Sequence, residues 1–156
     1  MSSVPSIPEQ CRRQADWCKS LGSTLYTHFL YCCAHLALHR GMVANFLSAL
    51  HSGDFEALVK LLDPEVVVRA DQAAIPAGAP REIRGAQIAA QQAIASSRGA
   101  KAARLALING VPGLIVAPGG KLFRVLTFSF AESAIAEIDV LGAPAGLANL
   151  EIALLD

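Results

Sequence analysis

Two aspartates could supply acid or base chemistry, because each lies beside apolar residues of a predicted strand. Asp139 lies between Ile138 and Val140. Asp71 follows the apolar run that starts at Val66. A carboxylate held in an apolar pocket has a raised pKa, and it can then act as a general base for enolisation or as a general acid. The sequence therefore makes Asp139 and Asp71 the candidate catalytic residues.

Basic and aromatic side chains on the predicted strands are the candidates for a ligand pocket. Arg69 shares its strand parity with Asp71, whereas Arg104 and Arg124 lie on two other strands. Phe128 belongs to the apolar parity of the longest strand. Because successive side chains point to opposite faces of a sheet, one parity of each strand lines any pocket. We therefore predict a ligand-binding pocket at Arg69, Arg104, Arg124 and Phe128.

The same residues have a second interpretation, which the sequence leaves open. Asp139, Arg69 and Arg124 would then lie on the solvent face of the sheet, and Asp71 would only end a strand. The two interpretations differ in which strand parity faces the pocket, and alternation alone does not decide this. His51 lies at a predicted helix end, where a cation is favoured, and we expect it at the surface.

Cysteine and histidine crowd together near the end of the first 40 residues. Cys32, Cys33, His35 and His39 lie within eight positions of one another. Zinc sites usually combine two ligand pairs at fixed spacing, and these residues do not follow that pattern. We interpret them as apolar thiols and ordinary histidines, and we expect neither a metal nor another cofactor.

The composition predicts one domain with a substantial core, preceded by a different extension. The chain has 156 residues, of which 53% are hydrophobic and 17% charged, enough for one core. All four cysteines, the only tryptophan and both tyrosines lie in the first 40 residues. We therefore place an N-terminal extension at 1–40 and the main domain at 41–156. Thirteen basic and thirteen acidic residues cancel, which argues against direct binding of nucleic acid.

One uncharged stretch, residues 20–38, has the length of a membrane span. Serine, threonine and histidine interrupt it, and no apolar core like that of a signal peptide occupies the first residues. We therefore expect neither membrane insertion nor export, and we expect the protein in the cytoplasm.

Hydrophobic spacing and turn residues predict an α+β fold. Residues 54–62 form an amphipathic helix with Asp54 as its N-cap, and Pro64 ends that helix before an apolar strand. Asn109-Gly110 predicts a hairpin. The other predicted elements are helices at 43–50, 85–97 and 144–154, a loop at 72–84, and strands at 103–108, 113–117, 122–130 and 135–141. This order predicts a curved antiparallel sheet wrapped on helices.

Several segments resemble the SnoaL-like, nuclear-transport-factor-like family in order and spacing. They are GDFEALVKLLDPEVVVRAD at 53–71, IRGA at 83–86, ALINGVPGLIV at 106–116 and AIAEIDVL at 134–141. The resemblance covers residues 39–150 and is nearest to the C-terminal domain of extracytoplasmic-function RNA polymerase sigma factors. It implies a cone-shaped sheet around N-terminal helices, an apolar pocket at the open end, pairing into a homodimer, and contact with RNA polymerase or a sigma factor.

The resemblance implies two classes of function. Some relatives are cyclases, ketosteroid isomerases or epoxide hydrolases, whereas the domain appended to sigma factors is regulatory. Residues 1–40 do not resemble polymerase-binding or DNA-reading regions, and no tyrosine follows Tyr31 to supply the donor of a ketosteroid isomerase. We therefore expect a non-catalytic regulatory or ligand-binding domain that takes a small apolar ligand. The alternative is a small cofactor-independent isomerase, cyclase or epoxide hydrolase. The change near residue 40 and the internal Met42 suggest a domain separated from its sigma factor, or a start assigned too far upstream.

Overall fold

The computed structural model describes residues 24–155 and divides the chain into two compact units, Met1–Gly41 and Met42–Asp156. Within the first unit, the rings of His35 and His39 lie 5.8 Å apart. Burial, and then the charge of His35, lower the pKa of His39. Cys11 and Cys18, together with the side chains of Cys32 and Cys33, lie outside the described part of the chain.

The predictions about metal binding and membrane insertion concern a part of the chain of which the structure describes some residues. No three His, Cys, Asp or Glu residues among them gather in a group that could hold a metal ion. None of the helices described is both long enough and apolar enough to cross a membrane.

Helix α2, Thr24–Ser52, is longer than the helix predicted from the sequence, which began at residue 43. Residues 24–52 contain no proline, and a single glycine such as Gly41 weakens a helix without ending it. The helix therefore continues through the composition change near residue 40. It ends where Gly53 takes a positive φ of 68°, which is typical of a helix C-terminus.

The junction between helix and strand that the sequence predicts is confirmed. Helix α3, Phe55–Leu61, has Asp54 as its N-cap, and the side chain of Asp54 accepts a hydrogen bond of 3.1 Å from the amide of Ala57. Strand β1, Leu62–Ala70, begins at once. Its pairing with the neighbouring strand is irregular between Leu62 and Val67, the stretch that contains Pro64, because proline lacks the amide that a regular ladder requires.

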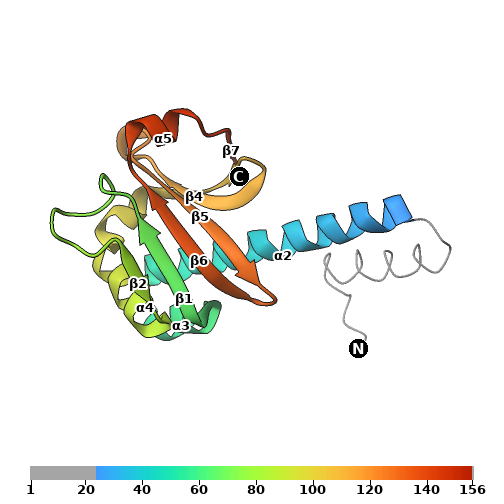
Figure 1. Cartoon of the computed structure of the whole chain (residues 1–156), viewed down its shortest axis with the longest axis horizontal. Coiled ribbons are helices and arrows are strands. Elements are labelled where there is room, and N and C mark those ends of the chain that lie inside the picture. The colour runs from blue at the N-terminus through green and yellow to red at the C-terminus, as the bar shows by residue number, and fades with distance from the viewer. Residues whose placement is uncertain (1–23, 156) are drawn as a thin grey trace. The chain divides into compact units, whose positions relative to one another are not determined.

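Seven strands form one open, curved sheet in the order β2-β1-β6-β5-β4-β3-β7 (Figure 1). The pair β1 and β6 is parallel, and the other neighbours are antiparallel. The predicted hairpin at Asn109-Gly110 is confirmed, since both residues have positive φ. The remaining strands are β2 at Glu82–Arg84, β3 at Ala103–Ile108, β4 at Val111–Val116, β5 at Arg124–Ala131, β6 at Ala134–Leu141 and β7 at Ile152–Leu154.

The predicted secondary structure was wrong in part of two segments, because short strands form there by pairing with the edge of the sheet. The predicted loop at 72–84 ends in strand β2, which pairs with β1. The predicted helix at 144–154 is only the short helix α5, Pro144–Ala148, and is followed by β7, which pairs with β3. In each case unpaired backbone groups at a strand edge offer hydrogen bonds that override a weak local preference.

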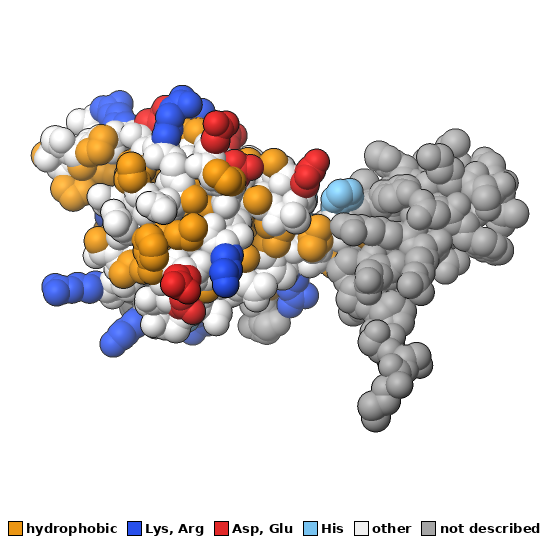
Figure 2. All heavy atoms as spheres, turned by 90° about the horizontal axis from the view of Figure 1, so that it is seen from below, with side chains coloured by type: hydrophobic (Ala, Val, Ile, Leu, Met, Phe, Trp, Pro, Cys, Tyr) orange, Lys and Arg blue, Asp and Glu red, His pale blue; other side chains and the backbone are white. Residues whose placement is uncertain are grey.

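The core of the second unit lies on the inner face of the sheet. Helix α4, Ala86–Ala95, packs against β1 and α3, and residues 42–52 of α2 supply the buried Phe46, whose ring meets that of Phe128 edge-on at 5.3 Å. A smaller apolar cluster lies on the outer face, where Val125 is covered by Leu147 and its neighbours. Hydrophobic side chains also reach the surface in patches among charged ones (Figure 2).

Candidate functional site

A cavity of about 400 Å³ lies on the inner face of the sheet, which is within the usual size range of small-ligand sites. Its walls come from α4 and the last part of α2, from the strands β1 to β6, and from three connecting segments, residues 71–81, the 3₁₀-helix η1 at Ser97–Ala102 and residues 118–123. The lining is mainly apolar and includes Phe46, Leu50, Leu62, Val68, Ala70, Ile75, Ile83, Ala89, Ala93, Leu114, Val116, Phe123, Leu126, Ile138 and Val140.

Strand alternation explains why the cavity is apolar. On β6, Ile138 and Val140 face inward, so Asp139 between them faces outward. On β1, Val68 and Ala70 face inward, and Arg69 faces outward for the same reason. The register confirms this division, because Asp139 lies directly opposite Arg69 across the parallel pair, and residues at such positions share a face.

All the charged residues that line the cavity are basic. Arg81, Arg98 and Lys101 are exposed residues of its lining, and Arg124 is a half-buried one. The side chain of Arg81 donates a hydrogen bond of 2.9 Å to Gln72. Among the described residues that line the cavity there is no aspartate, glutamate, histidine or tyrosine. The lining therefore combines an apolar surface with positive charge, and its one described side chain of the usual acid or base types is the exposed Lys101.

Arg124 is the cation most closely tied to the sheet. It begins strand β5 and lies opposite Val116 of β4, another lining residue. Its guanidinium carbon lies 4.9 Å from the centre of the Phe123 ring, a cation–π geometry that orients the planar group. Its Nε atom is buried, and it has no hydrogen-bond partner in the described part of the chain.

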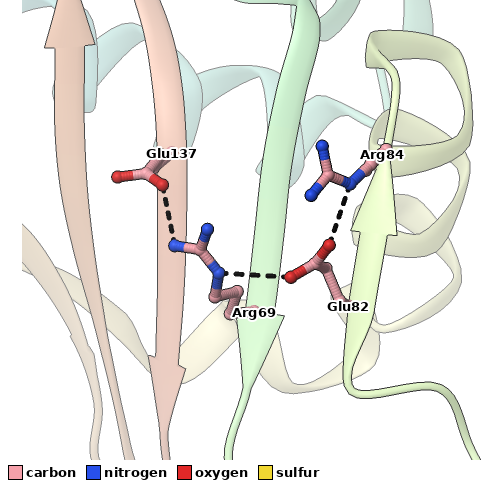
Figure 3. A network of polar contacts seen from close by, with 4 residues as sticks. All are labelled: Arg69, Glu82, Arg84 and Glu137. Carbon is pink, nitrogen blue, oxygen red and sulfur yellow. Dashed lines mark hydrogen bonds and ion pairs between the residues drawn. The ribbon is translucent and has the colours of Figure 1, made fainter.

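The structure places Arg69 and Asp139 outside the cavity lining. Arg69 belongs to a network on the outer face of the sheet (Figure 3). Its Nη1 lies 2.7 Å from Glu137 and its Nε 3.3 Å from Glu82, which also lies 2.8 Å from Nε of Arg84. Hydrogen bonds to Glu137 and Glu82 raise the pKa of Arg69. Hydrogen bonds from Arg84 and Arg69 lower the pKa of Glu82.

Asp71 is also outside the cavity lining, and both of its carboxylate oxygens are occupied. Oδ1 accepts a hydrogen bond from the amide of Ala74, and Oδ2 accepts from the amides of Gly142 and Ala143, each at 2.9 Å. Burial by itself raises the pKa of Asp71, but the backbone amides, led by Ala143 and Gly142, outweigh it and hold the pKa below its usual value.

These contacts give Asp71 a structural role. They join the loop after β1 to the segment that leaves β6, two places far apart in the sequence. The two backbones approach so closely that a Cβ on Gly142 would lie 2.9 Å from the amide nitrogen of Ala74. A glycine is therefore required where the two segments meet.

Of the four residues predicted to line the pocket, the structure places only Arg124 in the lining. Arg104 is exposed on β3 and lies opposite Ile115, a residue of the outer cluster. Phe128 is buried beside the cavity, where it packs on the lining residue Phe46. The sequence prediction did not include three cations of the lining, Arg81, Arg98 and Lys101, because they lie outside the predicted strands and no periodic pattern marks them.

The arrangement of elements matches known folds. No protein-family model and no curated protein matches the chain, but solved structures do. A de novo designed protein with a curved β-sheet is 14% identical over 70% of this chain and 88% of its own, with a TM-score of 0.52. An NTF2-like protein of unknown function from Cytophaga hutchinsonii is 16% identical over 71% and 95%, with a TM-score of 0.45. The chain has the α+β fold with a curved sheet that its sequence predicted, and it shares this fold with the designed protein.

The chain is also similar in structure to part of a sigma factor. The extracytoplasmic function sigma factor SigJ of Mycobacterium tuberculosis is 22% identical over 83% of this chain, with a TM-score of 0.57. The match covers 52% of SigJ, so the chain spans about half the length of that protein. At this level of identity the likeness establishes a shared fold.

Proposed function

We propose that the unit at residues 42–156 is a non-catalytic domain that binds a small apolar ligand and acts as a regulator. The observation that supports this best is the cavity, which is large enough for a ligand and mainly apolar. Its described lining holds no carboxylate, imidazole or phenol, and its one lysine, Lys101, is exposed. Asp71 and Asp139, the two candidate acids, are also outside that lining. An isomerase or hydrolase would require such a group at the reacting atoms.

The regulatory part of the proposal rests on the resemblance to domains of sigma factors and on the fold likeness to SigJ. We propose that ligand binding changes how this domain contacts a protein partner, and that the partner is RNA polymerase or a sigma factor. Pairing of two copies through their sheets belongs to the same proposal. The cancelled charge of the chain supports a protein partner over direct contact with nucleic acid.

The test is binding of uncharged apolar compounds, such as decanol and methyl decanoate, measured by thermal shift and isothermal titration calorimetry. Ala93→Leu fills part of the cavity, because Ala93 lies in its lining. We expect this variant to weaken binding about tenfold, by the cost of overpacking. The matched control is Ala95→Leu, an exposed position at the end of the same helix and outside the lining. The proposal fails if no compound binds, or if Ala93→Leu binds as well as the control. Turnover of a bound compound would support the enzyme class instead.

A further inference from the structure

The charged side chains that line the cavity all carry positive charge. Its described lining contains Arg81, Arg98, Lys101 and Arg124, and no carboxylate that could neutralise them. This contrasts with the chain as a whole, in which basic and acidic residues are equal in number. Positive charge around an apolar cavity raises the local concentration of anions, and it favours a ligand of complementary charge.

Arg124 differs from Arg69 in its ion-pair partners. Arg69 lies on the outer face and has two carboxylate partners, Glu137 and Glu82. Among the described residues the side chain of Arg124 forms no ion pair, and its buried Nε atom has no hydrogen-bond partner. The half-buried side chain of Arg124 lines the cavity without a carboxylate partner among the described residues, so its positive charge is available to an anionic ligand.

The geometry of the guanidinium favours a carboxylate as the anionic group of the ligand. The two Nη groups at the end of an arginine side chain match the two oxygens of a carboxylate, so that one carboxylate can accept two parallel hydrogen bonds from them. The ring of Phe123 at 4.9 Å covers one face of the guanidinium, and the Nε atom is buried, so a carboxylate would contact the Nη groups. Arg124 is the half-buried cation of the lining and balances one negative charge beside the apolar surface, whereas Arg81, Arg98 and Lys101 are exposed to water. The mainly apolar lining suits a hydrocarbon tail.

We propose that the cavity binds an apolar monocarboxylate, with its tail on the inner face of the sheet and its head group held by Arg124. The exposed Arg98 and Lys101 attract the anion without forming the main contact. This inference rests on the proposed function, because it names the chemical class of ligand that the cavity takes.

The experiment compares decanoate with its uncharged ester, methyl decanoate, by isothermal titration calorimetry of the full chain. We expect decanoate to bind more tightly. Arg124→Gln should weaken decanoate binding about ten- to hundredfold, the value of hydrogen bonds to a charged group, and should leave the ester unaffected. Lys101→Gln, which removes an exposed cation of the same lining, is the matched control and should weaken decanoate binding much less. Thermal melts of both variants establish that they fold.

The possible results distinguish the carboxylate inference from the proposal of an apolar ligand pocket. If the ester binds as tightly as decanoate, or if Arg124→Gln and Lys101→Gln weaken decanoate equally, the carboxylate inference is overturned and the apolar pocket stands. If inorganic phosphate competes with decanoate, the site selects anions in general and the inference is also overturned. If neither decanoate nor the ester binds, the cavity is closed to apolar ligands, for example by another segment of the chain or a second copy, and both proposals fall.

Discussion

Replacing Asp71 should destabilise the domain, because its carboxylate joins two segments that are far apart in the sequence. The carboxylate accepts three backbone hydrogen bonds of 2.9 Å, from Ala74, Gly142 and Ala143. A hydrogen bond to a charged group contributes about 1.5–3 kcal/mol when it is well buried, but this carboxylate is only partly buried, so each bond counts for less. We expect Asp71→Ala to lower the free energy of unfolding by about 2 kcal/mol, and Asp71→Asn, which keeps one acceptor oxygen, by about 1 kcal/mol.

Thermal unfolding measures this effect directly. For a chain of this length, a loss of about 2 kcal/mol corresponds to a fall in Tm of about 4–8 °C. The matched control is Asp139→Asn, an aspartate of the outer face for which we expect no change, because its side chain makes no hydrogen bond with the described residues. An Asp71→Ala protein with the Tm of the wild type would refute the role of Asp71 as a link between the two segments.

The pH dependence gives a second test of the same contact. The pKa of Asp71 is lower in the folded protein than in the unfolded chain, so the unfolded chain binds the proton more readily. The stabilisation is then fully present above the unfolded pKa of about 3.9, and it is lost as the pH falls through the folded value. The difference in stability between the wild type and Asp71→Asn should therefore shrink below about pH 4. A difference that grows in acid would contradict this explanation.

Two further substitutions test the packing and the surface. Gly113→Ala places a Cβ 2.5 Å from Ile108 Cδ1 and 2.7 Å from the backbone oxygen of Leu126. Urea unfolding should therefore show that the free energy of unfolding falls by about 1–3 kcal/mol. The control is Gly146→Ala, whose Cβ meets nothing within 4 Å and should not destabilise the domain. Arg69→Ala breaks two ion pairs on the outer face. Because both pairs are exposed, we expect Tm to stay unchanged. A large fall in Tm would show that the network in Figure 3 stabilises the fold.

The sequence predicted elements whose signals are local. The N-cap at Asp54 and the hairpin at Asn109-Gly110 follow from the conformational preferences of those residues and their immediate neighbours. Strands β2 and β7 could not be predicted in this way, since each is short and forms because a neighbouring strand presents an unpaired edge. The short helix α5 was overestimated for the same reason.

The candidate site was predictable only in part. Alternation along β6 showed that Asp139 and its two neighbours lie on opposite faces, and both interpretations of the sequence were consistent with that pattern. The structure places Ile138 and Val140 in the cavity lining and Asp139 outside it. Arg124 was a candidate in the sequence, but its buried Nε and its place beside Phe123 depend on the surrounding strands.

By itself, then, the amino-acid sequence determined the α+β class, the junction of α3 with β1 and the parity of each long strand, because these depend on neighbouring residues. Only the tertiary structure decided which parity faces the cavity, how Asp71 joins two distant segments, and which cations line the cavity. The physical reason is that burial and cross-strand pairing are set by contacts between residues far apart in the chain. A periodic pattern records that a strand has two faces, and the packing of helices selects the one that is covered.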